Sequence, residues 1–139
     1  MLEAVTSKAA VADVHVQGFY TDEVLDGSSR VGFDVITIPD GKRDVLSRKQ
    51  GLPSHFPKTG SYSVDVASFE ALALPTLCPP TSCSNSRCLI VIDEIGRMEL
   101  HSAKFQAAVE KLLTEYPDAI VFGAVTAPIY GHRMPFCDR

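Results

Sequence analysis

The chain has 139 residues, of which 45% are hydrophobic and 22% are charged, values typical of one globular domain and not of a disordered or fibrous chain. Its formal net charge is −4 and its basic residues are scattered, which argues against a general nucleic-acid partner. No apolar run approaches the roughly 20 residues of a membrane span, and the first residues lack a secretory signal, so we expect a cytoplasmic protein with no membrane partner.

The first half of the chain predicts a helix followed by an antiparallel hairpin. Residues 1–14 have one apolar helical face and no N-terminal cap, which indicates the later part of a helix. Residues 15–21 and 30–38 have strand-like composition, and an Asp-Gly-Ser-Ser turn lies between them. Residues 39–59, rich in Gly, Pro and charge, predict a loop with room for one short strand, and residues 60–64 predict another strand.

A second helix is predicted just before the middle of the chain. Asp65 or Ser68 can cap a helix over residues 69–74, near whose end Pro75 is tolerated. Residues 78–87 contain two prolines and several serines, and they predict an exposed linker without a function of its own.

A buried strand that runs into two carboxylates is the most informative feature. Residues 89–92 are apolar, as in the interior of a parallel sheet, and Asp93 and Glu94 follow directly. Because ligands gather at the carboxyl ends of such strands, these side chains lie where α/β folds carry out chemistry. In nucleotide hydrolases an acidic residue here holds Mg²⁺, usually through water, and a neighbouring group orients the attacking water. Helix capping or a surface turn is the alternative role.

The acidic strand begins a strand-helix-strand unit. Ser102 can cap a helix that extends to Tyr116, and residues 119–125 predict a second buried strand. This order predicts two parallel strands. The apolar stripe of the helix comprises Phe105, Ala108, Val109, Leu112 and Leu113, for which core packing is the favoured role.

The sequence does not contain the phosphate-binding loop that usually accompanies such an acidic strand. That loop has the pattern Gly-x-x-x-x-Gly-Lys-Ser/Thr. The one Gly-Lys pair here is Gly41-Lys42, with Ile36 at the first glycine position and Arg43 after the lysine. The sequence therefore contains the acidic part of a nucleotide site but not its phosphate-binding loop.

Four cysteines raise the question of zinc or disulfide bonds. Cys78, Cys83 and Cys88 are spaced five residues apart, and Cys137 lies near the end of the sequence. There is no Cys-x-x-Cys pair, and no histidine lies near the first three cysteines, so free thiols in a reducing compartment are favoured over a zinc site.

Several segments together carry a resemblance to a known family. The acidic pair lies in Ile-Asp-Glu-Ile-Gly-Arg-Met-Glu-Leu at residues 92–100. Upstream are Gly-Phe-Tyr-Thr-Asp-Glu-Val at 18–24, Arg-Val-Gly-Phe-Asp at 30–34 and Phe-Glu-x-Leu-Ala-Leu-Pro at 69–75. In this combination and order, from about residue 1 to 128, the chain resembles the nucleoside-triphosphatases that include the cancer-related and the thermostable archaeal-type enzymes.

The resemblance implies a fold and an activity. The fold is a P-loop α/β domain, a parallel sheet with an added antiparallel hairpin, that occupies residues 1–139. The activity is hydrolysis of the terminal phosphate of ATP, GTP and other nucleoside triphosphates with Mg²⁺. Family members also have a first strand, the phosphate loop and further C-terminal elements, so the resemblance implies that this domain is partial.

The resemblance also implies roles for individual residues. Asp93 is expected to help hold Mg²⁺ through water, and Glu94 to orient or activate the attacking water. Gly96 is expected to permit a sharp turn after the strand and to lie at the nucleotide. Arg30 and Arg97 are weaker candidates for phosphate contacts, with a solvated side chain or a surface ion pair as the alternative.

The function as a whole has three interpretations. The favoured one is a nucleoside-triphosphatase whose printed residues alone turn over little, because the phosphate-loop contacts are missing. The second is a short form that does not hydrolyse nucleotide and binds a partner, through an apolar sheet edge expected at residues 119–125. The third is a nucleotide kinase-like phosphotransferase, which needs an acceptor pocket and a basic lid that the sequence does not reveal. Nothing in the sequence indicates an oligomeric state.

Overall fold

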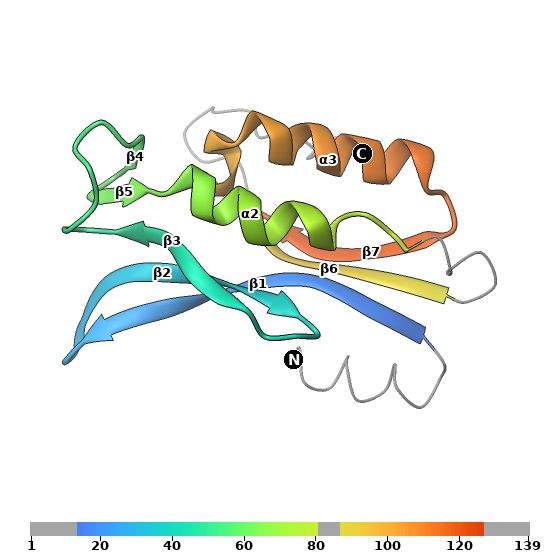
Figure 1. The fold of residues 1–139 in the computed structure, drawn as a ribbon, viewed down its shortest axis with the longest axis horizontal. Helices are drawn as coiled ribbons and strands as arrows, with labels where there is room; N and C mark the ends of the chain where they lie inside the picture. Colours follow the sequence, from blue (N-terminus) through green and yellow to red (C-terminus); the bar gives the residue numbers. More distant parts are fainter. Residues whose placement is uncertain (1–13, 81–86, 127–139) are drawn as a thin grey trace.

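The computed structural model describes residues 14–80 and 87–126, which form one twisted sheet with two helices on the same face (Figure 1). The strands are β1 (Val14–Asp26), β2 (Ser29–Ile38), β3 (Arg43–Arg48), β4 (Lys58–Thr59), β5 (Tyr62–Val64), β6 (Arg87–Ile95) and β7 (Ala119–Val125). The helices are α2 (Val66–Thr76) and α3 (Ala103–Glu115), with a 3₁₀ turn η2 (Glu99–His101) before α3. The strand order is β4-β5-β3-β2-β1-β6-β7. The prediction of an α/β fold with parallel strands and an added hairpin is confirmed for the residues described.

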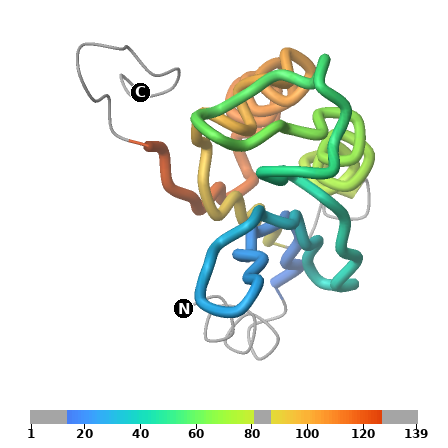
Figure 2. The backbone as a smooth tube through the Cα atoms, turned by 90° about the vertical axis from the view of Figure 1, so that its left-hand side faces the viewer, coloured from blue at the N-terminus to red at the C-terminus, as the bar shows by residue number. Residues whose placement is uncertain are grey.

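β1 joins the antiparallel and the parallel parts of the sheet. It pairs antiparallel with β2, as the predicted hairpin requires, and parallel with β6 on its other side. Both hairpin strands are longer than predicted, and they extend beyond the rest of the sheet in Figures 1 and 2. This long β1 places Phe19 beside Ile92, one residue before the acidic pair.

The segment predicted as mostly loop contains more strand than expected. The six residues of β3 pair antiparallel with β2, and the short β4 and β5 continue the sheet beyond β3. The composition of this segment hid β3, because three of its six residues are charged and its buried residues, Leu46 and Ser47, are adjacent and do not alternate with exposed ones. The predicted strand at residues 60–64 is confirmed only for β5, since Gly60 lies in the turn before it with φ of 60°.

α2 begins earlier than predicted, at Val66. Of the two candidate caps, Asp65 is the one used: its Oδ1 accepts a hydrogen bond from the Ser68 N–H at 3.0 Å. Pro75 lies in the last turn of α2. It has no backbone N–H to donate, but the helix ends one residue later, at Thr76, so the interruption falls at the helix end.

The acidic strand is longer than predicted. β6 runs to Ile95, so Asp93 and Glu94 lie within its last residues and not beyond its end, which corrects the prediction. The parallel pairing of β6 with β7 is confirmed. Ser102 caps α3 as expected, with its Oγ accepting from the Phe105 N–H at 2.9 Å. Leu113 was expected on the buried stripe of α3, but its side chain is 41% exposed.

The core is centred on three aromatic rings that come from β1, α2 and α3. Phe19, Phe69 and Phe105 are each at most 1% exposed, and their ring centroids lie 5.2 to 5.8 Å apart in edge-to-face geometry. Edge-to-face packing favours aromatic pairs beyond the area they bury. The cluster holds both helices against the same face of the sheet and so sets the height of η2 above the end of β6.

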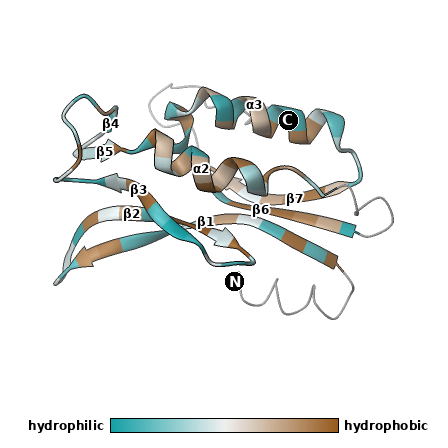
Figure 3. Ribbon diagram, in the orientation of Figure 1, coloured by the Kyte–Doolittle hydropathy of each residue, from teal (hydrophilic) through white to brown (hydrophobic). Residues whose placement is uncertain are grey.

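β7 is an edge strand among the residues described, and this corrects the prediction that it is buried. Its apolar character is clear in Figure 3, where brown residues run along β6 and β7. β6 covers one side of it, but Ile120 is 53% exposed and Phe122 is 44% exposed. The expected apolar edge is therefore present in the described part of the chain.

Some predictions fall on residues outside the described ranges, namely most of the helix predicted over residues 1–14, most of the predicted linker, Cys83 and Cys137. Val14, the last residue of that predicted helix, is instead the first residue of β1. No disulfide joins Cys78 or Cys88 to another cysteine of the described ranges. Arg87, predicted in the linker, is the first residue of β6. In the described ranges neither helix combines the length and the apolar content that a membrane crossing requires.

Candidate functional site

The two carboxylates of β6 lie next to β1 on one side and β7 on the other. Asp93 is half-buried, and its Oδ2 accepts a long hydrogen bond of 3.4 Å from the Thr21 N–H. Since strand residues alternate between faces, Asp93 and Glu94 project to opposite sides of the strand. The backbone of β1 therefore orients Asp93.

Glu94 is exposed and is oriented from the other side. The Thr126 hydroxyl, at the carboxyl end of β7, donates to Glu94 Oε1 at 2.5 Å. The Thr126 N–H donates to the Ile95 carbonyl at 3.1 Å, which ties this residue to β6. One carboxylate oxygen of Glu94 is thus held by the neighbouring strand, and the other has no hydrogen bond to any described residue.

Gly96 follows the strand, but it does not serve there as a residue of unusual backbone conformation. It is not among the glycines with positive φ. It is buried, and a Cβ on it would meet Glu99 Oε2 at 3.1 Å, Thr126 Oγ1 at 3.2 Å and Glu94 Oε1 at 3.3 Å. The chain turns directly after Gly96 without a positive φ, and the missing side chain leaves room for two carboxylates and a hydroxyl to converge.

Glu99 is a buried carboxyl that the sequence analysis did not single out. It is 5% exposed, and its Oε2 accepts from the Gly96 N–H at 2.9 Å. Burial raises the pKa of Glu99 to about 7, with a smaller contribution from the charges of Glu94 and Asp93, while backbone hydrogen bonds act in the opposite direction. The site therefore holds a carboxyl group that titrates near neutrality.

Replacing Glu99 with glutamine is expected to remove a pH-dependent loss of stability. The ordinary pKa of 4.5 rises to about 7 on folding, so the folded protein retains a proton that the unfolded chain loses between these values. The free energy of unfolding should then fall as pH rises through this window, by about 3 kcal/mol at most, and stay low above it. The glutamine of the Glu99→Gln variant stays neutral. The free energy of unfolding of the variant should therefore increase relative to that of the wild type as pH rises. Urea unfolding at several pH values measures this, and a wild-type–variant difference that is constant with pH contradicts it.

A cavity of about 240 Å³ adjoins the acidic strand. Its walls come from β1, β2, β3, β4, the end of β6 and the residue after β7, so elements distant in sequence meet there. The lining residues are Thr21, Phe33, Leu46, Thr59, Glu94, Gly96, Arg97, Met98, Glu99 and Thr126. The lining combines apolar side chains with two carboxylates, one arginine and three threonines.

The donor set suits a hard divalent cation held mainly by other oxygens. The Asp93 carboxylate offers oxygens of the kind that such cations prefer, and Glu94, on the other side of the strand, is held by Thr126. Among the described residues, no cluster of three or more His, Cys, Asp or Glu side chains could enclose a metal ion. A cation here would keep most of its ligands from water or from a substrate.

The structure does not bring Arg30 to the acidic pair. Arg30 lies at the start of β2, where it donates to Glu23 at 2.6 Å and to the Tyr62 hydroxyl at 3.1 Å. Its guanidinium also lies 5.0 Å from the centroid of the Phe33 ring. These partners raise the pKa of Arg30, first through the hydrogen bond to Tyr62. A phosphate contact by Arg30 stays a prediction.

Arg97 does lie beside the site, because it lines the cavity together with Glu94. The Gly41-Lys42 pair does not: it lies in the turn between β2 and β3, where Lys42 pairs with Asp40 at 2.9 Å. This supports the view that it is not a phosphate loop.

Thr21, Glu99 and Thr126 are site residues that sequence reasoning missed. A signal existed for Thr126, because it is the first polar residue after an apolar strand predicted to lie parallel to β6. No comparable signal marked Glu99, whose burial depends on the turn that follows β6.

Several known proteins resemble this chain in sequence. A family model described as NTPase matches residues 1–129. The chain is 44% identical over 120 residues to the cancer-related nucleoside-triphosphatase of Homo sapiens, covering 83% of this chain and 62% of that protein. It is 39% identical over 103 residues to the nucleoside-triphosphatase THEP1 of Thermotoga maritima, covering 74% of this chain and 56% of that protein. The chain therefore spans only part of the length of these relatives.

Two solved structures resemble the fold. The solution structure of a human cancer-related nucleoside triphosphatase matches with a TM-score of 0.77 and 40% identity, over 95% of this chain and 70% of that one. The crystal structure of THEP1 from Aquifex aeolicus matches with a TM-score of 0.70 and 34% identity, over 88% of this chain and 68% of that one.

Proposed function

The chain belongs to the NTPase family, and from that premise we propose that the protein hydrolyses the terminal phosphate of ATP, GTP and other nucleoside triphosphates with Mg²⁺. The observation that supports this most directly is that Asp93, Glu94 and Thr126 all lie near the carboxyl ends of two parallel strands, with Thr126 hydrogen-bonded to Glu94. We also propose that it acts in the cytoplasm, since none of its described helices is long and apolar enough to cross a membrane.

Asp93 and Glu94 have separate roles in this proposal. Asp93 would hold Mg²⁺, usually through water, while the Thr21 N–H fixes its other oxygen. The cation would neutralise charge on the β- and γ-phosphates. Glu94 would orient the attacking water and accept its proton, with Thr126 holding Oε1 so that Oε2 faces the water. Gly96, which has no side chain, leaves space beside Glu94 Oε1 and the Thr126 hydroxyl.

The phosphates need further contacts that the printed residues do not include. Phosphoryl transfer depends mostly on positioning and charge neutralisation, which in P-loop enzymes come from loop amides and a lysine. No Gly-x-x-x-x-Gly-Lys-Ser/Thr occurs in the 139 residues. We propose that a polypeptide of these residues alone has little turnover and that activity needs a segment that supplies this loop.

The test compares two polypeptides. One has the printed sequence, and the other adds whatever coding sequence lies in frame upstream of Met1 in the mapped transcript. Release of phosphate from ATP and GTP is measured with and without Mg²⁺. We expect turnover in the longer polypeptide only, dependent on Mg²⁺. No release from a longer polypeptide that carries a phosphate loop contradicts the proposed activity, and robust release by the printed residues alone contradicts the need for the loop.

The exposed edge of β7 favours a second candidate, in which the protein binds a partner through strand addition. An unpaired strand edge is a template for another strand, and lysine on such an edge prevents pairing. Replacing Phe122 with lysine is therefore expected to reduce concentration-dependent association of the printed polypeptide, as measured by sedimentation velocity. Leu25→Lys is the matched control, since Leu25 is 58% exposed at the hairpin end. An equal effect of both substitutions contradicts a role of the β7 edge.

A further inference from the structure

A second hollow adjoins the cavity beside the acidic pair. It has a volume of about 390 Å³ and shares Thr59 and Arg97 with that cavity. Its lining contains three basic side chains and no carboxylate. The lining residues are Lys58, Thr59, Gly60, Arg97, Leu100 and His101, and we call this hollow the basic groove.

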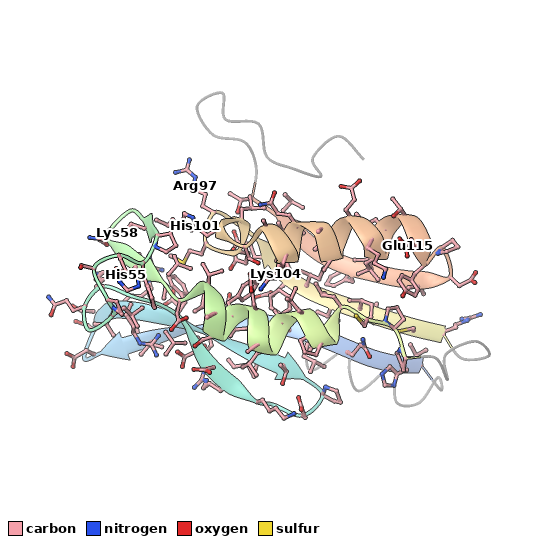
Figure 4. The ribbon with its side chains drawn as sticks, turned by 45° about the horizontal axis from the view of Figure 1, so that its top comes forward. His55, Lys58, Arg97, His101, Lys104 and Glu115 are labelled. Carbon is pink, nitrogen blue, oxygen red and sulfur yellow. The ribbon has the colours of Figure 1, made fainter. Side chains whose placement is uncertain are left out.

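The basic groove is assembled from segments that are distant in the sequence. Lys58 lies on β4, Arg97 follows β6, and His101 ends η2. The His101 ring Nε2 and the Thr59 hydroxyl are 2.9 Å apart, so a hydrogen bond joins β4 to η2 across the groove. Figure 4 shows all three basic side chains at the same end of the molecule, away from Glu115. Their proximity is a property of the tertiary structure.

Two of these cations are unpaired, unlike most others in the structure. Lys104 pairs with Glu70 at 2.8 Å, and Arg48 with Asp34 at 2.6 Å. Neither Lys58 nor Arg97 has an ion pair or a side-chain hydrogen bond with any residue of the ranges 14–80 and 87–126. The protein as a whole carries a formal net charge of −4. A local excess of positive charge on such a protein creates a field that attracts anions.

We propose that the basic groove binds a phosphate dianion. Arg97 can donate two parallel hydrogen bonds to a phosphate, Lys58 acts as a compact charge, and Thr59 lines the same groove. The dianion has two possible sources: the orthophosphate released at Glu94, or the phosphate group of a second molecule that occupies the remaining volume. Phosphate binding by the groove does not depend on the proposed hydrolysis. The first source, released orthophosphate, rests on the proposed function.

Amide spectra of the ¹⁵N-labelled protein test the proposal with orthophosphate and with a nucleoside monophosphate as probes. Orthophosphate should cause saturable shifts at the amides of Lys58, Thr59 and Arg97. Lys58→Gln and Arg97→Gln should each weaken binding about tenfold, as expected for loss of a hydrogen bond to a charged group. Both side chains are exposed, so the variants should remain folded. Lys111→Gln on α3, where Lys111 pairs with Glu115 at 3.8 Å, is the matched control.

Each outcome decides between the alternatives. Saturable binding of orthophosphate supports the groove with the product as source, and saturable binding of the monophosphate alone supports it with a second molecule as source. Shifts with neither probe, or shifts equally reduced by Lys111→Gln, overturn the proposal. Asp93→Asn should leave these shifts unchanged, because Asp93 does not line the groove. Phosphate binding in the groove, together with no nucleotide turnover by the longer polypeptide, contradicts the proposed activity and not the groove.

Discussion

Replacing Glu94 with glutamine is expected to lower the kcat of phosphate release by a factor of about 10² to 10⁴, the usual contribution of general acid–base catalysis. Glutamine retains the shape of the side chain, and its oxygen can still accept from the Thr126 hydroxyl. What is lost is the carboxylate that accepts a proton from water. Because Glu94 is exposed, the melting temperature should change little. Steady-state assays at saturating Mg²⁺ and nucleotide, in the form of the protein that turns over, measure the effect.

Two other substitutions separate catalysis from general charge effects. Glu115→Gln removes an exposed carboxylate at the far end of α3 and should leave kcat unchanged (Figure 4). Asp93→Asn should instead raise the Mg²⁺ concentration needed for half-maximal rate, because it weakens the proposed cation ligand. An E94Q enzyme with a wild-type kcat shows that the water is activated by another group.

Replacing Gly18 with alanine is expected to destabilise the fold by at least about 4 kcal/mol, a loss that few domains tolerate. Gly18 has φ of 139° and lies opposite Val91 where β1 pairs with β6. A Cβ on it would lie 1.9 Å from the Val91 carbonyl oxygen, so the two strands would have to separate. This pairing also positions Thr21 against Asp93, and the site should be lost with it. Urea unfolding followed by circular dichroism measures the change.

Gly41→Ala is the control for backbone conformation alone. Gly41 also has a positive φ, of 66°, but a Cβ on it would meet nothing within 4 Å. Its replacement should therefore cost only the roughly 1 to 2 kcal/mol of a left-handed residue. Equal losses for the two variants would show that the close approach of β1 and β6 relaxes without penalty.

Local patterns predicted most of the elements, because the hydrophobic period and the capping residues are written in adjacent residues. Ser102 and Asp65 cap their helices through hydrogen bonds that span three residues. β3 was underestimated for the opposite reason: its stability comes from pairing with β2 and β5, and this is not visible in its own charged sequence.

The candidate site divides in the same way. Asp93 and Glu94 follow a run of apolar strand residues, so their position near the carboxyl ends of parallel strands could be predicted from the sequence alone. Their partners Thr21 and Thr126 lie 72 and 32 residues away. Only strand order brings them together, and strand order depends on long-range packing.

The sequence by itself determined the family, the α/β class and the acidic pair, because each depends on residue order within short segments. The tertiary structure alone decided which side chains surround that pair. Glu99 acquires its raised pKa mainly through burial, and Lys58 and Arg97 line one groove only because the fold brings β4 to the turn after β6. Burial and local charge are properties of neighbours in space, and these neighbours are set by the packing of the whole sheet and its helices.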